Sequence, residues 1–224
     1  HDAIPRAIRI KETLLLSSGS HGKYLGRIDL KVNNGRVVET SSNLIPIFSD
    51  IIPPDKEIRN LINKVRAPFE KECNRIVGET ETLLYRRGNF NGSWDDVICD
   101  TIIQERDTEI SFSPGFRWGT TILPGQKITI DDIYSQTAMN YPEVYRIEMT
   151  GKMIKELLED VCDNIFNPDP FFQQGGDMVR VGGIKYTCSP KNEMGKRISN
   201  LRIASTDQPL ETSKKYIVGG WGSV

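Results

Sequence analysis

Residues 171–183 read Phe-Phe-Gln-Gln-Gly-Gly-Asp-Met-Val-Arg-Val-Gly-Gly, the most distinctive stretch of the sequence. Two glycine pairs, Gly175-Gly176 and Gly182-Gly183, enclose Asp177 and Arg180. Glycines at this density release backbone N–H groups that can line an anion-binding concavity. An arginine between such flexible joints is expected on a loop that adapts to a substrate. A β-bulge or a pair of tight turns would use the same glycines, so the stretch alone leaves both interpretations open.

The residues around this stretch predict a mixed domain. Thr150 can cap a helix whose apolar residues recur at three- and four-residue steps up to Ile165. A second helix is predicted after Ser93, with Asp96 at the capping-box position, and a short one after Thr129. Strands are predicted at residues 109–113, 144–149, 184–188, 198–204 and 216–219. The predicted fold class is α+β.

The first third of the chain has a different pattern. Residues 26–39 alternate apolar and polar side chains around Asn34-Gly35, which predicts a β-hairpin. A proline-marked linker follows, and then a helical pattern from Ile58 to Ile76 that Pro68 should kink or break. We expect three parts: strands belonging to an incomplete domain (residues 1–45), a linker with a bridging helix (46–76) and a second domain (77–224). Because neither end looks like a natural terminus, we expect a piece of a longer protein.

The composition excludes several classes of function. The 224 residues carry 29 Lys and Arg against 30 Asp and Glu, a net charge of −1. That balance argues against a nucleic-acid platform and a polybasic membrane surface, and no apolar run approaches the roughly 20 residues of a membrane span. The four cysteines form no CxxC pair, so a zinc site is not expected. Cys99 and Cys162 are expected to be buried free thiols, and the sequence assigns no disulfide.

Two further segments carry arginines in positions suited to anion binding. Arg117 follows a Pro-Gly turn and stands between two aromatic residues, and its planar fork suits phosphate or sulfate oxygens. A structural ion pair would explain Arg117 equally well. Arg86 and Asn89 precede the start of a helix, where anions bind well, although a surface charge would also account for an arginine there.

The two histidines are candidates of another kind. His1 stands directly before a β section and could be a metal ligand through a neutral ring nitrogen. His21 lies in a loop of small residues that allows close approach of the backbone. An ordinary surface or structural histidine is the alternative in both cases.

Taken together, these segments resemble the 5′-nucleotidase superfamily, and within it the SoxB-type thiosulfohydrolases of bacterial sulfur oxidation. The resemblance covers essentially the whole chain. The motifs that carry it are His-Asp-Ala-Ile-Pro at residues 1–5, Ser-Gly-Ser-His-Gly at 18–22, Arg-Arg-Gly-Asn-Phe-Asn-Gly at 86–92, Pro-Gly-Phe-Arg-Trp-Gly at 114–119, Met-Thr-Gly at 149–151 and Gln-Gln-Gly-Gly-Asp-Met-Val-Arg-Val-Gly-Gly at 173–183.

The resemblance implies a two-domain enzyme of which this chain holds the second domain and the last strands of the first. The first, a metallophosphoesterase domain, would bind two divalent metal ions, manganese in the Sox enzymes, with His1 as one ligand and most ligands outside this chain. Arg117 and Arg180 would be the catalytic residues that hold the anionic group. The expected substrate-binding residues are Gly175, Gly176, Asp177, Arg86, Asn89, Tyr141, which lies near a stacking position of the superfamily, and His21.

The implied activity is release of sulfate from a cysteine S-thiosulfonate on a SoxYZ-type sulfur-carrier protein, in the periplasm, during thiosulfate oxidation. The chain alone is expected to be inactive. The alternatives are a 5′-nucleotidase or cyclic-nucleotide phosphodiesterase, and a binding module without chemistry. Nucleotidases of the superfamily have Gly-Gly-Ile-Arg where this chain has Gly115-Phe116-Arg117-Trp118, which makes the nucleotide alternative the weaker one.

Overall fold

The computed structural model describes residues 3–20, 22–116, 119–137 and 143–222. The chain divides into two compact units, His1–Pro68 and Phe69–Val224. The division falls inside the segment 46–76 for which a linker and a bridging helix are predicted.

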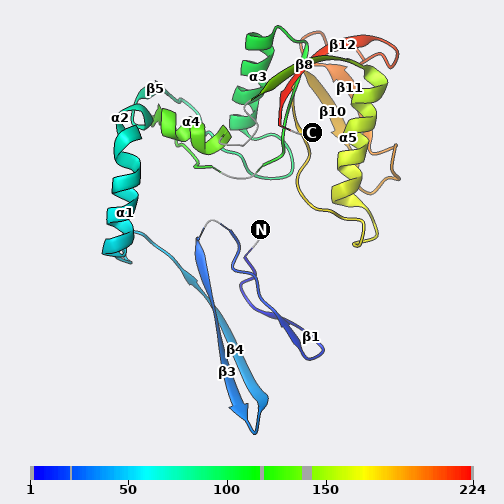
Figure 1. Cartoon of the computed structure of the whole chain (residues 1–224). Helices are drawn as coiled ribbons and strands as arrows, with labels where there is room; N and C mark the ends of the chain where they lie inside the picture. The colour runs from blue at the N-terminus through cyan, green and yellow to red at the C-terminus, as the bar shows by residue number, and fades with distance from the viewer. Residues whose placement is uncertain (1–2, 21, 117–118, 138–142, 223–224) are drawn as a thin grey trace. The chain divides into compact units, whose positions relative to one another are not determined.

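The described residues of the first unit form two hairpins and a helix, which Figure 1 shows. The hairpins pair β1 (Ile8–Ile10) with β2 (Thr13–Leu15) and β3 (Tyr24–Asn33) with β4 (Arg36–Pro46). Asn34 and Gly35 form the turn between β3 and β4, with φ angles of 47° and 74°, as a two-residue hairpin turn requires. The predicted hairpin is thus confirmed. None of the described residues of this unit is buried.

The helical segment that ends the first unit is shorter than its sequence pattern. Helix α1 (Lys56–Arg66) begins at Asp55, whose carboxylate accepts the Ile58 N–H at 2.9 Å. Pro68 lies in a 3₁₀ turn (Ala67–Phe69) before the short helix α2 (Glu70–Cys73), so the predicted break at this proline is confirmed. The helical pattern does not continue to Ile76, because that residue begins strand β5 (Ile76–Glu79).

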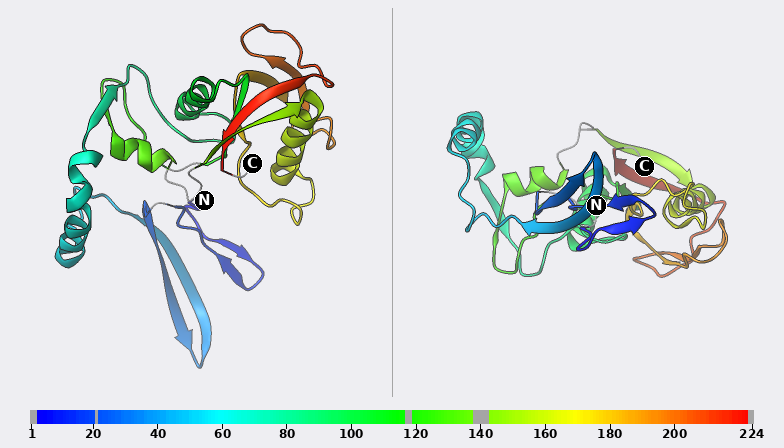
Figure 2. Two further views of the ribbon diagram at one scale, coloured as in Figure 1. Left: turned by 45° about the horizontal axis from the view of Figure 1, so that its top comes forward. Right: turned by 90° about the horizontal axis from the view of Figure 1, so that it is seen from below.

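The second unit is built around a four-stranded sheet. In spatial order its strands are β8 (Val144–Thr150), β12 (Lys215–Trp221), β6 (Ile110–Ser113) and β9 (Arg180–Gly182). Strand β12 is parallel to β6, and the other neighbours are antiparallel. Strand β12, red in the left view of Figure 2, is therefore an interior strand although it comes last in the sequence.

Two helices cover opposite faces of this sheet, α3 (Ser93–Arg106) and α5 (Gly151–Phe166). Ile110 and Phe112 of β6 are fully buried in the core that includes Leu158 of α5. Between them, Ser111 points the other way, and its hydroxyl donates to the Cys99 carbonyl of α3 at 2.9 Å. Strands β10 (Ile184–Cys188) and β11 (Ile198–Ile203) form a pair, and β5 pairs with β7 (Lys127–Thr129), which leads into α4 (Ile130–Thr137). The α+β class is confirmed.

The helix starts test the capping predictions. Thr150 caps α5 as predicted, since its hydroxyl accepts the Met153 N–H at 3.2 Å. Thr129 caps α4, and its own N–H donates to Asp132 at 2.8 Å.

The prediction for α3 is wrong by one residue. The N-cap is Gly92 rather than Ser93, so the third helical residue is Asp95 and not Asp96. The Asp95 carboxylate accepts the Gly92 N–H at 2.9 Å. The Asp96 side chain instead accepts a hydrogen bond from Asn91 at 2.8 Å.

Candidate active site

Three loops of the second unit meet at the end of the sheet where β6 stops and β9 begins. They are residues 86–92 before α3, residues 113–116 at the end of β6 and residues 175–180 at the start of β9. The Met178 N–H donates to the Asn89 carbonyl at 3.0 Å. A Cβ on Gly115 would lie 2.5 Å from the Met178 carbonyl oxygen, so this position in the turn requires glycine. The structure thus brings together three of the stretches that the sequence singled out.

A buried group of charged side chains fills the space beneath these loops. Arg86 donates through Nε to the Asp95 carboxylate at 2.6 Å, and its two terminal nitrogens donate to the carbonyls of Gln136 and Pro114 at 2.7 and 3.0 Å. Both partners of the Arg86–Asp95 pair are fully buried. The side chain of Arg86 therefore holds three separate segments, and the alternative of a surface charge does not apply to Arg86. A role in substrate binding stays a prediction.

Arg180 extends the same group. Its Nε lies 3.4 Å from the second oxygen of Asp95, and its Nη2 lies 3.4 Å from Asp177 and donates to the Gly88 carbonyl at 2.9 Å. Arg180 is fully buried and pairs with Ser113 as the first residue of β9. The expectation of a flexible loop around Arg180 is therefore wrong, because strand pairing and ion pairs hold both its backbone and its side chain.

We refer to Arg86, Asp95, Asp177 and Arg180 as the buried charge cluster. Burial raises the pKa of the Asp95 carboxyl above its ordinary value, although the guanidinium of Arg86, the Gly92 N–H and the guanidinium of Arg180 act in the opposite direction. Removing charges from water costs free energy that their mutual attraction only partly offsets. The two positive and two negative side chains balance, so the cluster by itself offers an anion no net positive charge.

The two glycine pairs serve different purposes. Gly175 and Gly176 are exposed and have φ angles of 82° and 90°, a conformation that favours glycine. The Gly175 N–H donates to the Asn164 carbonyl at 3.2 Å. Gly182 lies against α3, where a Cβ would come within 2.8 Å of the Cys99 Cβ. The second pair is therefore explained by close packing, and the first by the shape of the exposed loop.

An aromatic pair flanks the site. Phe116 and Trp221 meet edge to face, with ring centroids 6.3 Å apart and an interplanar angle of 63°. The Trp221 indole N–H donates to the Ser113 hydroxyl at 2.8 Å, and the ring is buried. In contrast, Phe171 and Phe172 are 94% and 65% exposed just before the exposed glycines.

Four of the residues singled out from the sequence lie outside the described residues. They are His1, His21, Arg117 and Tyr141. Of these, Arg117 follows directly on the described turn 113–116. Their roles stay predictions.

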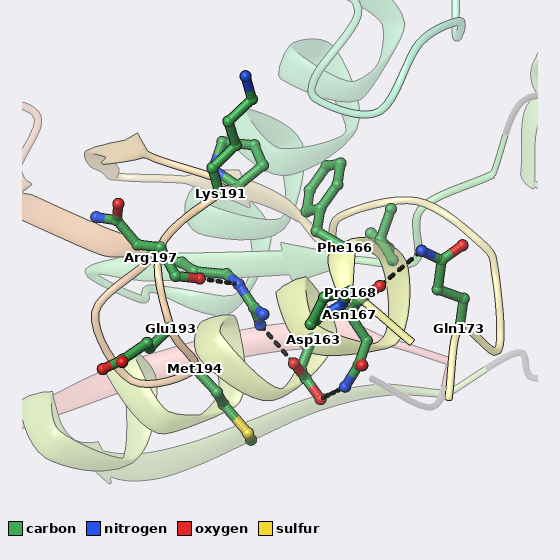
Figure 3. Close-up of a pocket in the computed structure, with 12 residues that line it drawn as sticks. Asp163, Phe166, Asn167, Pro168, Gln173, Lys191, Glu193, Met194 and Arg197 are labelled. Atoms are coloured by element: carbon green, nitrogen blue, oxygen red, sulfur yellow. Dashed lines mark hydrogen bonds and ion pairs between the residues drawn. The ribbon is translucent and has the colours of Figure 1, made fainter. Parts of the chain in front are cut away.

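A cavity of about 780 Å³ lies elsewhere, between the end of α5 and the loop 190–197 (Figure 3). On its wall Arg197 donates to the Asp163 carboxylate at 2.5 Å and to the Asn192 carbonyl at 2.9 Å. Hydrogen bonds from Arg197 and Asn167 keep the pKa of Asp163 below its ordinary value. Gln173 lines this cavity, but none of the described site residues named above does, so the cavity is not the predicted site.

Glu159, one helical turn before Asp163, holds the same loop and was missed in the sequence. It is buried, and its carboxylate accepts the backbone N–H groups of Gly195, Arg197 and Ile198 at 3.0, 3.2 and 2.7 Å. The sequence signal for this contact is a glutamate among the apolar residues of a helix. A carboxylate is buried there only when hydrogen-bond donors surround it.

The described residues do not supply a set of ligands for the metal ions that the resemblance implies. Within residues 3–20, 22–116, 119–137 and 143–222, no three His, Cys, Asp or Glu side chains gather to hold a metal ion. His1 lies outside those ranges. The described residues therefore hold no such group of metal ligands.

The family to which these loops and this sheet belong follows from comparison with known proteins. Residues 76–221 match the model of the 5′-nucleotidase C-terminal domain, and the chain belongs to that family. The predicted similarity to SoxB is confirmed: the sulfate thiohydrolase SoxB of Thermus thermophilus, solved in complex with glycerol, is 34% identical, with a TM-score of 0.93 over 100% of this chain and 41% of that one.

Two further relatives extend the comparison. A 5′-nucleotidase precursor, also from Thermus thermophilus, is 16% identical with a TM-score of 0.78, over 97% of this chain and 44% of that one, and shares the fold. The trifunctional nucleotide phosphoesterase protein YfkN of Bacillus subtilis is 26% identical over 94% of this chain and 15% of its own length. The chain thus spans less than half of each of these three relatives. No helix among the described residues is long and apolar enough to cross a membrane.

Proposed function

We propose that the whole protein containing this chain is a hydrolase that releases sulfate from a cysteine S-thiosulfonate on a sulfur-carrier protein. The observation that supports this most is the similarity to SoxB, which extends over the entire chain at 34% identity. In the proposed reaction a bond forms between a water oxygen and the sulfonate sulfur. The bond from that sulfur to the sulfur chain on the carrier breaks, its electron pair stays on the carrier as a persulfide, sulfate leaves, and the two protons of the water pass to solvent.

The role proposed for this domain is to bind and neutralise the sulfonate. Arg180 is balanced by Asp95 and Asp177 inside the buried charge cluster, so its charge alone would attract an anion weakly. Arg117, on the segment that follows the turn 113–116, would supply the additional positive charge. Its guanidinium offers two parallel N–H donors to two sulfonate oxygens.

The exposed rim of the site would meet the rest of the substrate. Gly175 and Gly176 are exposed, Asn89 is half-buried, and the Asp177 side chain is buried. The divalent metal ions, manganese in this proposal, would be bound by parts of the protein beyond the described residues, with a contribution from His1. The proposed location is the periplasm, where the carrier would be a SoxYZ-type protein, and the chain alone would be inactive.

A nucleotidase is the second candidate, because relatives such as YfkN are named as nucleotide phosphoesterases. The exposed rings of Phe171 and Phe172 beside Gly175 could stack on a base. Against this candidate, Trp221 is buried and tied to Ser113, so that ring is not available for stacking.

The two candidates are separated by assaying the whole protein on two substrates. One is a carrier peptide with a cysteine S-thiosulfonate, assayed for sulfate, and the other is AMP, assayed for phosphate. We expect sulfate release with a kcat/KM far above that for AMP, and Phe171→Ala should leave it nearly unchanged. Phosphate release from AMP without sulfate release, and its loss in Phe171→Ala, would favour the nucleotidase and refute the proposal.

A further inference from the structure

Two cysteines of the second unit lie in contact although they are 26 residues apart in the sequence. Cys162 is on α5 and Cys188 is the last residue of β10, and their Sγ atoms are 3.5 Å apart. Cys162 is fully buried and Cys188 is half-buried. Cys73 and Cys99 have no such sulfur neighbour among the described residues.

We propose that Cys162 and Cys188 form a disulfide when the protein meets a thiol–disulfide oxidant. A disulfide needs an S–S distance of about 2.0 Å, so the sulfurs must approach by roughly 1.5 Å. We expect rotation about the two Cα–Cβ bonds to supply this movement. No metal ion and no residue outside this unit is required.

The reaction proceeds by two exchanges. The Cys188 thiolate attacks one sulfur of the oxidant's disulfide, which forms a mixed disulfide and releases one thiolate. The Cys162 thiolate then attacks the Cys188 Sγ, which closes the new bond and releases the second thiolate. The oxidant gains two electrons and the protons of both cysteine thiols, so the exchange is balanced. The greater exposure of Cys188 makes it the first to react.

The environment of the pair favours a stable disulfide. Burial is the main cause that raises the pKa of the Cys162 thiol to about 12. Proteins that are strong disulfide oxidants stabilise their reduced thiolate form, whereas this site does not stabilise a thiolate. Once formed, the bond should therefore resist reduction. The same raised pKa makes the second exchange slow in the folded protein.

The disulfide would link elements that other contacts already join. Cys162 lies between Glu159 and Asp163, which bind the loop 190–197, and Cys188 precedes that loop. The bond would close a loop of about 26 residues, which in the chain-entropy model corresponds to a rise in Tm of roughly 7–14 °C for a domain of this size.

The experiment uses the whole protein, fully reduced and then incubated with oxidised glutathione. The remaining thiols are alkylated, the protein is digested, and the masses of the peptides are measured by mass spectrometry. We expect the peptide with Cys162 to be joined to the peptide with Cys188, two hydrogens lighter than their sum, while Cys73 and Cys99 are alkylated. The oxidised protein should have a higher Tm than the reduced one.

Variants distinguish this bond from other effects of oxidation. Cys188→Ser and, separately, Cys162→Ala should abolish both the joined peptide and the oxidation-dependent rise in Tm, while Cys73→Ser, the matched control, should change neither. Alkylation of both Cys162 and Cys188 after full incubation would overturn the proposal. So would a stable mixed disulfide of glutathione with Cys188 alone, or an equal rise in Tm in Cys188→Ser.

Discussion

Replacement of Glu159 by glutamine tests how the domain holds the loop that follows β10. The variant keeps the size and shape of the side chain but removes its charge and one of its two acceptor oxygens. The native carboxylate accepts three backbone N–H groups, from Gly195 and Arg197 on one oxygen and Ile198 on the other. The glutamine amide must therefore point its own N–H₂ group at one or two of these donors.

The magnitude follows from these contacts. At least one buried N–H loses its acceptor, which costs about 1–3 kcal/mol. The bonds that remain change from charge-assisted to neutral and weaken by about 1 kcal/mol. We expect the free energy of unfolding of Glu159→Gln to fall by about 2–4 kcal/mol, a large fraction of the roughly 5–15 kcal/mol that stabilises a typical domain.

The assay is urea unfolding of the chain, with the change taken from the midpoint at an unchanged m-value. The matched control is Glu156→Gln on the same helix. Glu156 is exposed and lies 3.7 Å from Lys152, so its replacement should cost less than about 0.5 kcal/mol. If Glu159→Gln unfolds within about 0.5 kcal/mol of the native chain, the three hydrogen bonds do not hold the loop and the reasoning is refuted.

Three further predictions follow from the same structure. Arg197 and Asn167 lower the pKa of Asp163, so the stability that the Asp163 carboxylate contributes is present at neutral pH and is lost as the pH falls below about 4. The Tm of Asp163→Asn should therefore fall less between about pH 5 and 3 than the Tm of the native protein. An equal fall in Tm would contradict this. Arg117→Ala in the whole protein should lower kcat on the carrier substrate about 10²- to 10³-fold with the Tm preserved, and Arg117→Lys should recover only part of it; a native kcat would mean that Arg117 is structural. Limited proteolysis should cut first within residues 47–55, which are exposed and follow the end of β4. The first fragments are identified by mass spectrometry, and a first cut inside α5 would contradict the prediction.

The parts of the fold that could be predicted depend on neighbours in the sequence. Asn34-Gly35 specifies its hairpin because both residues accept positive φ. Thr150 and Thr129 specify helix starts because their hydroxyls reach an N–H three residues ahead. Pro68 breaks its helix because it has no N–H to donate. Each rule involves only a few adjacent residues.

The buried charge cluster could not be predicted in this way, because its members come from separate segments. Asp95 was missed since its role depends on Arg86, nine residues earlier, and on Arg180, 85 residues later. Arg180 was singled out by its glycine neighbours, but nothing local shows that the residue pairs with β6. The local signal was Gly92 as the N-cap of α3 with Asp95 three residues later. Serine is a more common N-cap than glycine, so the sequence pattern favoured Ser93 and Asp96 instead.

The interior position of β12 determines when this domain can fold during synthesis. Val218 pairs with Ile110 on one side and Ile147 on the other, so the central sheet lacks its middle strand until the ribosome has made residues 215–221. Pairings over such sequence separations fold slowly and leave unfinished sheets prone to aggregation. Until then β6 and β8 have unpaired edges that other chains can bind. A nascent chain stalled before residue 215 should therefore be protease-sensitive throughout α3 and α5 and should depend on chaperones to stay soluble.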